Sequence, residues 1–66
     1  MTPLKQAVKD LKAAGYFLKR SSGGHDIYYN PKLNTTIPLK RHAFNETHLR
    51  YIRKEIEQCS KRGNPT

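Results

Sequence analysis

Residues 21–31 read S-S-G-G-H-D-I-Y-Y-N-P, and this stretch predicts the turn and the returning strand of a β-hairpin. Its two glycines tolerate the positive φ angles of tight turns. The residues that follow, His25–Asn30, carry aromatic and β-branched side chains, which favour a strand. Alternation does not decide which face of this strand is buried, because Ile27 and Tyr29 compete with Tyr28 for the interior.

The flanking segments complete a three-stranded sheet. Tyr16–Arg20 is rich in aromatic residues and too short for a helix, so it predicts the first strand. Residues 31–34 make a second turn, and Thr35–Leu39 predicts the third strand, in which Pro38 indicates a sheet edge or a strand end. Residues 40–44 are expected to form a loop.

An amphipathic helix is predicted on each side of the strands. Thr2 and Pro3 supply the N-cap and the first helical residue of one helix, and Gly15 supplies its C-terminal stop. Its apolar face consists of Leu4, Ala7, Val8, Leu11 and Ala14. Asn45 is expected to cap the other helix, whose apolar stripe consists of Leu49, Ile52 and Ile56.

The order α-β-β-β-α predicts a small α+β domain, with both helices on one face of an antiparallel sheet and the other face open to solvent. The 66 residues leave room for one domain. We expect it to span residues 1–60, with residues 61–66 forming a frayed tail. A domain of this size buries only about 60% of its unfolded surface, so any site should be shallow.

The chain is strongly basic, with 13 Lys and Arg against 5 Asp and Glu and a formal net charge of +8. Such a charge indicates an anionic partner, with nucleic acid the first candidate and an acidic protein the second. One row of lysines on the first helix is either an ordinary solvated face or an edge that contacts phosphates without reading sequence. This row consists of Lys5, Lys9 and Lys12.

The single cysteine, Cys59, allows no internal disulfide and no thiolate metal cluster. The three histidines lie far apart in sequence, and Asp26 is the only acid in the sheet region, so we expect neither a metal nor another cofactor. No apolar run approaches the roughly 18 residues of a membrane span, and no signal-peptide core precedes the first helix. A cytoplasmic protein without membrane contact is expected.

His25 follows the turn residues Gly23 and Gly24, which would support it in a position accessible to a ligand. A histidine among cations suits the cleavage of a phosphodiester, because imidazole moves protons near neutral pH. His25 would be the general base that deprotonates a ribose 2′-hydroxyl; the alternative is a histidine packed beside the strand's tyrosines. His42, which follows two cations in a loop, is the better second histidine, whereas His48 reads as a surface residue of the second helix. The candidates for binding the phosphate or donating a proton are Lys19, Arg20, Lys40, Arg41 and His42.

The residues from Gly15 to Pro31, G-Y-F-L-K-R-S-S-G-G-H-D-I-Y-Y-N-P, resemble the signature of the HicA toxin family. That signature has a glycine and an aromatic residue, then an arginine, then a Gly-Ser-His turn that leads into an aromatic strand. The segments I-P-L-K-R-H and L-R-Y-I-R-K-E-I resemble its proline-to-histidine loop and its closing helix. Two positions depart from the pattern: Gly24 replaces a serine, and Thr47-His48 replaces a Gly-Thr pair.

The resemblance implies a fold like that of double-stranded-RNA-binding domains. It also implies an mRNA interferase, an endoribonuclease of a bacterial or phage toxin–antitoxin pair that is neutralised by a HicB-type antitoxin within a hetero-oligomer. The histidine chemistry described above needs no metal. The catalytic histidine of the family falls on His25. We expect the antitoxin to inhibit by covering this histidine and its basic surroundings.

Two other functions agree with the same charge and fold. A non-catalytic module that binds double-stranded RNA or DNA would tolerate the loss of His25, whereas the loss of the first-helix lysines would weaken its binding uniformly. A protein that only docks an acidic partner would bind no nucleic acid even at low salt, where phosphate contacts are strongest.

Overall fold

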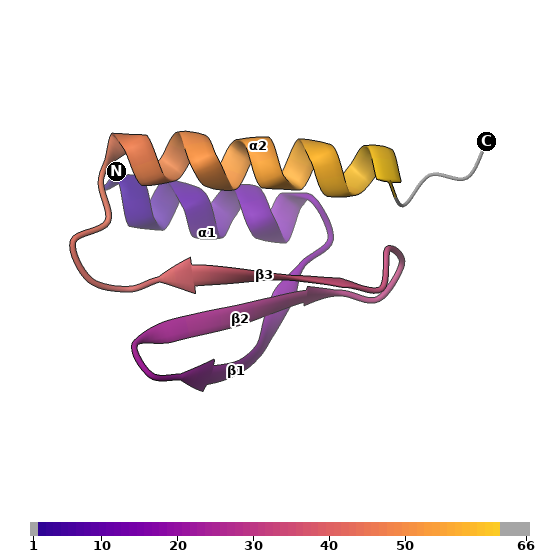
Figure 1. Ribbon diagram of the computed structural model, residues 1–66, viewed down its shortest axis with the longest axis horizontal. Coiled ribbons are helices and arrows are strands. Elements are labelled where there is room, and N and C mark those ends of the chain that lie inside the picture. Colours follow the sequence, from indigo (N-terminus) through magenta and orange to yellow (C-terminus); the bar gives the residue numbers. More distant parts are fainter. Residues whose placement is uncertain (1, 63–66) are drawn as a thin grey trace.

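The protein folds as a helix, three strands and a second helix, in the order that the sequence predicts (Figure 1). The structure is a computed structural model, and it describes residues 2–62. The elements are α1 (Pro3–Ala13), β1 (Phe17–Ser22), β2 (His25–Asn30), β3 (Thr35–Lys40) and α2 (Glu46–Arg62). The strands form an antiparallel sheet in the order β1-β2-β3. The predicted α+β class is therefore confirmed.

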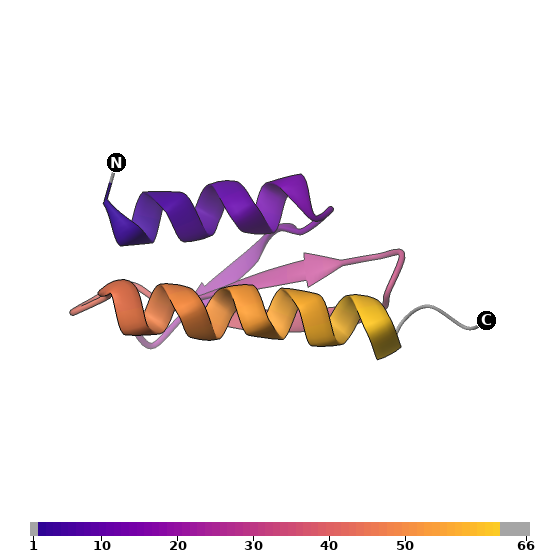
Figure 2. The ribbon, with the colours of Figure 1, turned by 90° about the horizontal axis from the view of Figure 1, so that it is seen from above.

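The two helices lie side by side on one face of the sheet (Figures 1 and 2). They run in the same direction, because three antiparallel strands, each reversing the chain, lie between them in the sequence (Figure 1). Residues from both helices and from the inward face of the sheet make one core, which consists of Ala7, Leu11, Tyr16, Tyr28, Ile37, Leu39, Leu49, Ile52 and Cys59. Tyr28 thus occupies the interior, and Ile27 and Tyr29 are only partly buried on the other face.

Both ends of α1 have the caps that its sequence predicts. Thr2 Oγ1 accepts a hydrogen bond from the Lys5 N–H at 3.2 Å, and a proline begins the helix. At the other end, Gly15 adopts φ +97°, and the N–H groups of Gly15 and Tyr16 donate to the carbonyls of Lys12 and Leu11. This pattern is a Schellman motif, which needs a residue with positive φ at the glycine position. It turns the chain so that Tyr16 enters the core.

The first strand differs from the prediction in its bounds. Tyr16 is a buried residue before the strand, and Ser21 and Ser22 belong to the strand and not to the turn. The pairing shifts by one residue between Leu18 and Arg20, so that β1 bulges there. The turn shrinks to the two glycines, whose positive φ angles match the twist of a two-residue hairpin.

Two further boundaries differ from the sequence-based expectation. Lys40 ends β3, where a loop was expected, because it pairs with the first residue of β2. The second helix runs to Arg62, two residues past the expected end of the domain. The rest of the expected tail, residues 63–66, lies outside the described residues. Pro38 lies in an edge strand, as its missing N–H requires.

One buried polar side chain joins α1 to the second turn. Asn30 is 3% exposed, and its Nδ2 donates to the Ala14 carbonyl at 3.1 Å. Its Oδ1 accepts from the backbone N–H groups of Lys32 and Leu33, at 2.9 and 3.2 Å. The side chain therefore satisfies backbone groups of two segments that lie far apart in sequence.

Candidate active site

The glycine turn places His25 at the beginning of β2. Gly23 and Gly24 have φ angles of +54° and +82°, and the Gly24 carbonyl accepts a hydrogen bond from the Arg41 N–H at 3.2 Å. In the sheet, His25 pairs directly with Lys40 of β3. Directly opposed residues have Cβ atoms about 5 Å apart, so an exposed imidazole and an exposed ammonium-bearing side chain are neighbours.

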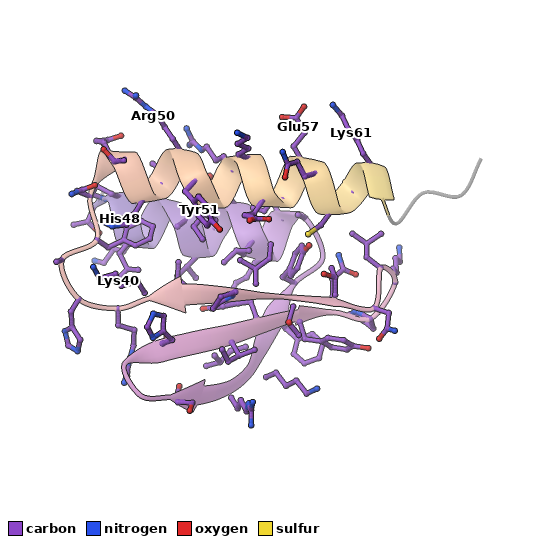
Figure 3. All side chains as sticks on the ribbon, in the orientation of Figure 1. Lys40, His48, Arg50, Tyr51, Glu57 and Lys61 are labelled. Atoms are coloured by element: carbon purple, nitrogen blue, oxygen red, sulfur yellow. The ribbon has the colours of Figure 1, made fainter. Side chains whose placement is uncertain are left out.

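A groove of about 210 Å³ opens between this end of the sheet and the first turns of α2. Figure 3 shows the side chains of Lys40, His48 and Tyr51 gathered there. The groove is lined by His25, Pro38, Lys40, Phe44, His48, Tyr51 and Ile52. It combines an apolar floor with two imidazoles, one cation and a phenol, which are groups that can bind an anion and move a proton.

His48 lines this groove, a position that its expected place on the surface of the second helix did not predict. Its ring is partly buried and packs against Phe44, with ring centroids 5.5 Å apart. It holds the third position of α2 after the cap Asn45. The Asn45-x-x-His48 spacing is the signal that sequence reasoning missed, because it resembles a capping box with histidine in the place of Glu or Gln.

The cap of α2 fixes this histidine. Asn45 Oδ1 accepts from the N–H groups of Thr47 and His48, at 2.9 and 3.3 Å. In return, His48 Nδ1 accepts from the Asn45 N–H at 3.2 Å. Three N–H donors at the helix start are thereby satisfied, and Asn45 and His48 bond each other reciprocally as in a capping box.

His42 lies outside the groove. It is exposed, and its Cδ2 lies 3.8 Å from the position that a Cβ on Gly24 would occupy. The ring of His42 therefore lies beside Gly24 in the hairpin turn. Among the three histidines, His25 and His48 share a site, and the predicted partnership of His25 with His42 finds no support in the groove's lining.

Arg41 supports the turn through an acid. Its Nε lies 3.5 Å from Asp26 Oδ1, which also accepts a hydrogen bond from the Ser21 hydroxyl at 2.7 Å. These contacts tie β1, β2 and the end of β3 together beside His25. Arg41 is half exposed, so its guanidinium can contact solvent or a ligand as well.

The remaining predicted cations are not among the residues that line the groove. Lys19 Nζ sits 4.8 Å above the ring of Tyr29, which also packs edge-on against Phe17. Arg20 pairs with Ile27 on the exposed first strand. The lysines of α1 are exposed on the helix layer and line no part of the groove. The structure thus brings Lys40 to His25, and it distributes the other cations around the surface.

The Tyr51 hydroxyl remains a donor at neutral pH. A hydrogen bond to the Glu55 carboxylate, together with its negative charge, raises the pKa of Tyr51 above its ordinary value. Its single proton is engaged by Glu55, so Tyr51 can donate to an anionic ligand only by releasing that carboxylate.

The described part of the chain contains neither a candidate metal site nor a candidate membrane-spanning helix. Residues 2–62 contain no group of three or more His, Cys, Asp or Glu side chains placed to hold a metal ion. Within the same residues, neither helix is both long enough and apolar enough to cross a membrane.

Comparison with known proteins gives one match. A family model described as the HicA toxin of bacterial toxin–antitoxin systems matches residues 4–59, which run from the first turn of α1 well into α2. No curated protein and no solved structure matches the chain. The matched segment includes the complete sheet, the glycine turn and the groove. The chain therefore belongs to the HicA family, the toxins of bacterial toxin–antitoxin pairs, which generally cleave mRNA and have an antitoxin as partner.

Proposed function

We propose that the protein is a metal-independent endoribonuclease of the cytoplasm, with His25 as its general base. The observation that carries this proposal is the direct pairing of His25 with Lys40 at the mouth of a groove. The pairing joins a proton acceptor to a cation, and both are needed to cleave a phosphodiester without a metal. The two residues sit on adjacent strands, so their spacing is set by the sheet.

The proposed reaction is an internal transesterification of RNA. The His25 imidazole takes the proton of a ribose 2′-hydroxyl, and the 2′-oxygen forms a bond to the adjacent phosphorus. The bond from phosphorus to the 5′-oxygen breaks, and that oxygen takes up a proton. The products are a 2′,3′-cyclic phosphate and a 5′-hydroxyl end. Lys40 would stabilise the charge that gathers on the phosphate oxygens.

The other cations would bind the RNA backbone on either side of the cleaved bond. Contacts of this kind position a nucleic acid without reading its sequence. Lys19 lies beside two aromatic rings, so a base that stacks there would meet a cation as well. The residues assigned to backbone binding are Lys5, Lys9, Lys12, Lys19, Arg20, Arg41 and His42.

The test is RNA cleavage by the purified protein in EDTA, with His25→Ala as the principal variant. We expect the native chain to cleave and His25→Ala to lose at least about 100-fold in rate, because general-base catalysis contributes roughly 10²–10⁴-fold. His42→Ala, assayed at saturating RNA, is the matched control for the rate, since His42 is an exposed histidine outside the groove and would supply only a backbone contact for binding. The RNA fragments should end in cyclic phosphate.

Two results would redirect the assignment. Cleavage that stops in EDTA and returns with a divalent ion would contradict the metal-free mechanism. If neither the native chain nor His25→Ala cleaves RNA, and both bind it at low salt, the protein is a non-catalytic binding module. The net charge of +8 is the observation that favours this second candidate.

We also propose that a HicB-type antitoxin inhibits by covering His25 and the groove. The groove is shallow, so direct occlusion needs no change of fold in the toxin. Hydrogen exchange in the complex should slow at residues 24–26 and at the start of α2. A complex that leaves both segments as exposed as in the free protein would contradict this mode of inhibition.

A further inference from the structure

We propose that His48 is a phosphate-binding residue, which donates a hydrogen bond from a neutral imidazole to a non-bridging phosphate oxygen in the groove. The inference rests on the proposed function, because it takes the groove to be the place where the RNA phosphate lies. It adds a second functional histidine, and it assigns that histidine a role other than proton transfer.

The cap of α2 determines which ring nitrogen of a neutral His48 can donate. His48 Nδ1 accepts a hydrogen bond from the Asn45 N–H, and a ring nitrogen can accept only when it carries no proton. The neutral imidazole must then carry its proton on Nε2. The backbone thus dictates which nitrogen of His48 is the donor.

The ring that carries this donor lines the groove. Nδ1 is engaged at the helix start, so Nε2 is the ring nitrogen left for a ligand. The ring stacks at 33° against Phe44, which limits its rotation, and both side chains line the groove with His25. Donors would therefore reach a phosphate from two elements, His48 from α2 and Lys40 from β3.

The backbone N–H groups at the start of α2 are not the proposed phosphate donors. The Asn45 side chain already accepts from two of them, so the proposal does not depend on a free helix N-terminus. The donor that remains for an anion is the side chain of His48, which presents a proton at the far edge of the cap.

A neutral donor has a defined part in the reaction. Loss of the Nε2 proton would leave an imidazolate anion, so His48 in this state is no general acid. It keeps its proton throughout, and its hydrogen bond strengthens as negative charge gathers on the phosphate oxygens during attack. A donor that is fixed before the reaction contributes to transition-state stabilisation.

Substitution by Gln and by Glu separates this role from helix capping. Both side chains can accept the Asn45 N–H from the third helical position, as they do in capping boxes. Gln also retains an N–H₂ donor for the groove, whereas Glu supplies only acceptors and a negative charge. His48→Ala removes cap and donor together without adding charge.

The experiment measures three quantities for the native chain, His48→Gln, His48→Glu and His48→Ala. These are the thermal midpoint, the RNA cleavage rate, and the affinity for 2′-O-methyl RNA, which lacks the attacking hydroxyl. We expect His48→Gln to stay within about threefold of the native rate and affinity. We expect His48→Glu and His48→Ala to lose about 10- to 100-fold in cleavage, the range of a lost hydrogen bond to a charged group. All rates are taken at a temperature where each variant is folded.

Each pattern of results decides the proposal. Equal activity of His48→Gln and His48→Glu at equal thermal midpoints would reduce His48 to a capping residue. Loss of activity in the stable His48→Gln variant would point to an imidazolium acid and overturn the neutral donor, as would a folded His48→Ala with native activity. If the native chain does not cleave RNA, the proposed ribonuclease function is contradicted. The affinities of the variants for 2′-O-methyl RNA then still test whether His48 contacts a phosphate.

Discussion

At the scale of single residues, Tyr16 is a polar group without a partner in the core. It is 3% exposed, and its hydroxyl is without a hydrogen-bond partner among the described residues. Burial, and next the nearby Cys59 thiol, raise the pKa of Tyr16 to about 12. The thiol itself pairs with Thr35 Oγ1 at 3.7 Å, and burial is the larger cause of the raised pKa.

The Tyr16→Phe variant should lose less stability at high pH than the native chain. A folded-state pKa above the unfolded value of about 10 gives stability that is complete below pH 10 and lost as the pH rises through about 12. Phenylalanine has no ionisation to lose, so the free energy of unfolding should fall less between pH 9 and pH 12. Urea unfolding across this range checks it. Tyr28, whose pKa burial also raises, keeps part of the dependence in the variant, and identical curves for both proteins would contradict the assignment.

Asn30→Ala should destabilise the protein by about 1–3 kcal/mol, because it leaves buried backbone groups unpaired. The groups affected are the Ala14 carbonyl and the N–H groups of Lys32 and Leu33. Urea unfolding at neutral pH measures the change. Thr36→Ala, on the exposed side of β3, is the control, and an equal effect of the two substitutions would argue against this role for Asn30.

At the scale of the elements, an ion pair joins the two helices. Arg53 Nε of α2 lies 2.7 Å from Asp10 Oδ2 of α1, and Gln6 Nε2 donates to the other oxygen at 2.9 Å. Burial raises the pKa of Asp10, but the hydrogen bonds from Arg53 and Gln6 lower it more, so the net pKa lies below its ordinary value. The contact links helices that the sheet separates in sequence.

Arg53→Ala should cost roughly 0.2–1 kcal/mol at neutral pH, the range for partly exposed ion pairs. A lowered carboxylate pKa gives stability that is present above the unfolded value of about 3.9 and lost as the pH falls through the folded one. The variant should therefore lose less stability than the native chain on acidification below pH 4. Urea unfolding at pH 7 and pH 3 compares them, with the exposed neighbour Lys54→Ala as control. A cost that is equal at both pH values would show that the ion pair is not its source.

At the scale of the whole molecule, the cations of the groove and those of α1 should differ in their effects. Replacing Lys5, Lys9 and Lys12 by Gln should lower the salt dependence of RNA binding by about 0.7 per lost phosphate contact and leave the rate at saturating RNA unchanged. Lys40→Gln should lower the saturating rate as well, since it faces the reacting phosphate. Binding and cleavage at several salt concentrations measure both effects. A loss of saturating rate in the α1 variant, as large as that in Lys40→Gln, would place α1 in the active site.

The parts of the fold that local sequence governs were predictable. Caps, periodicity and glycine turns act within a few residues, so the order of elements and the end of α1 at Gly15 followed from the chain alone. The bounds of β1 did not, because a bulge opposite β2 shifts its pairing. The register of a sheet also decided that Tyr28 faces inward, where alternation had left the question open.

By itself, the sequence determined the α+β class, the membership of the HicA family and the exposed position of His25 behind its glycine turn. The tertiary structure alone decided which groups surround that histidine. Lys40 meets it through strand pairing and His48 through the start of α2, whereas His42, closer in sequence, lies outside the groove. The physical reason is that a site is built by contacts between distant segments, and those depend on how the whole core packs the helices on the sheet.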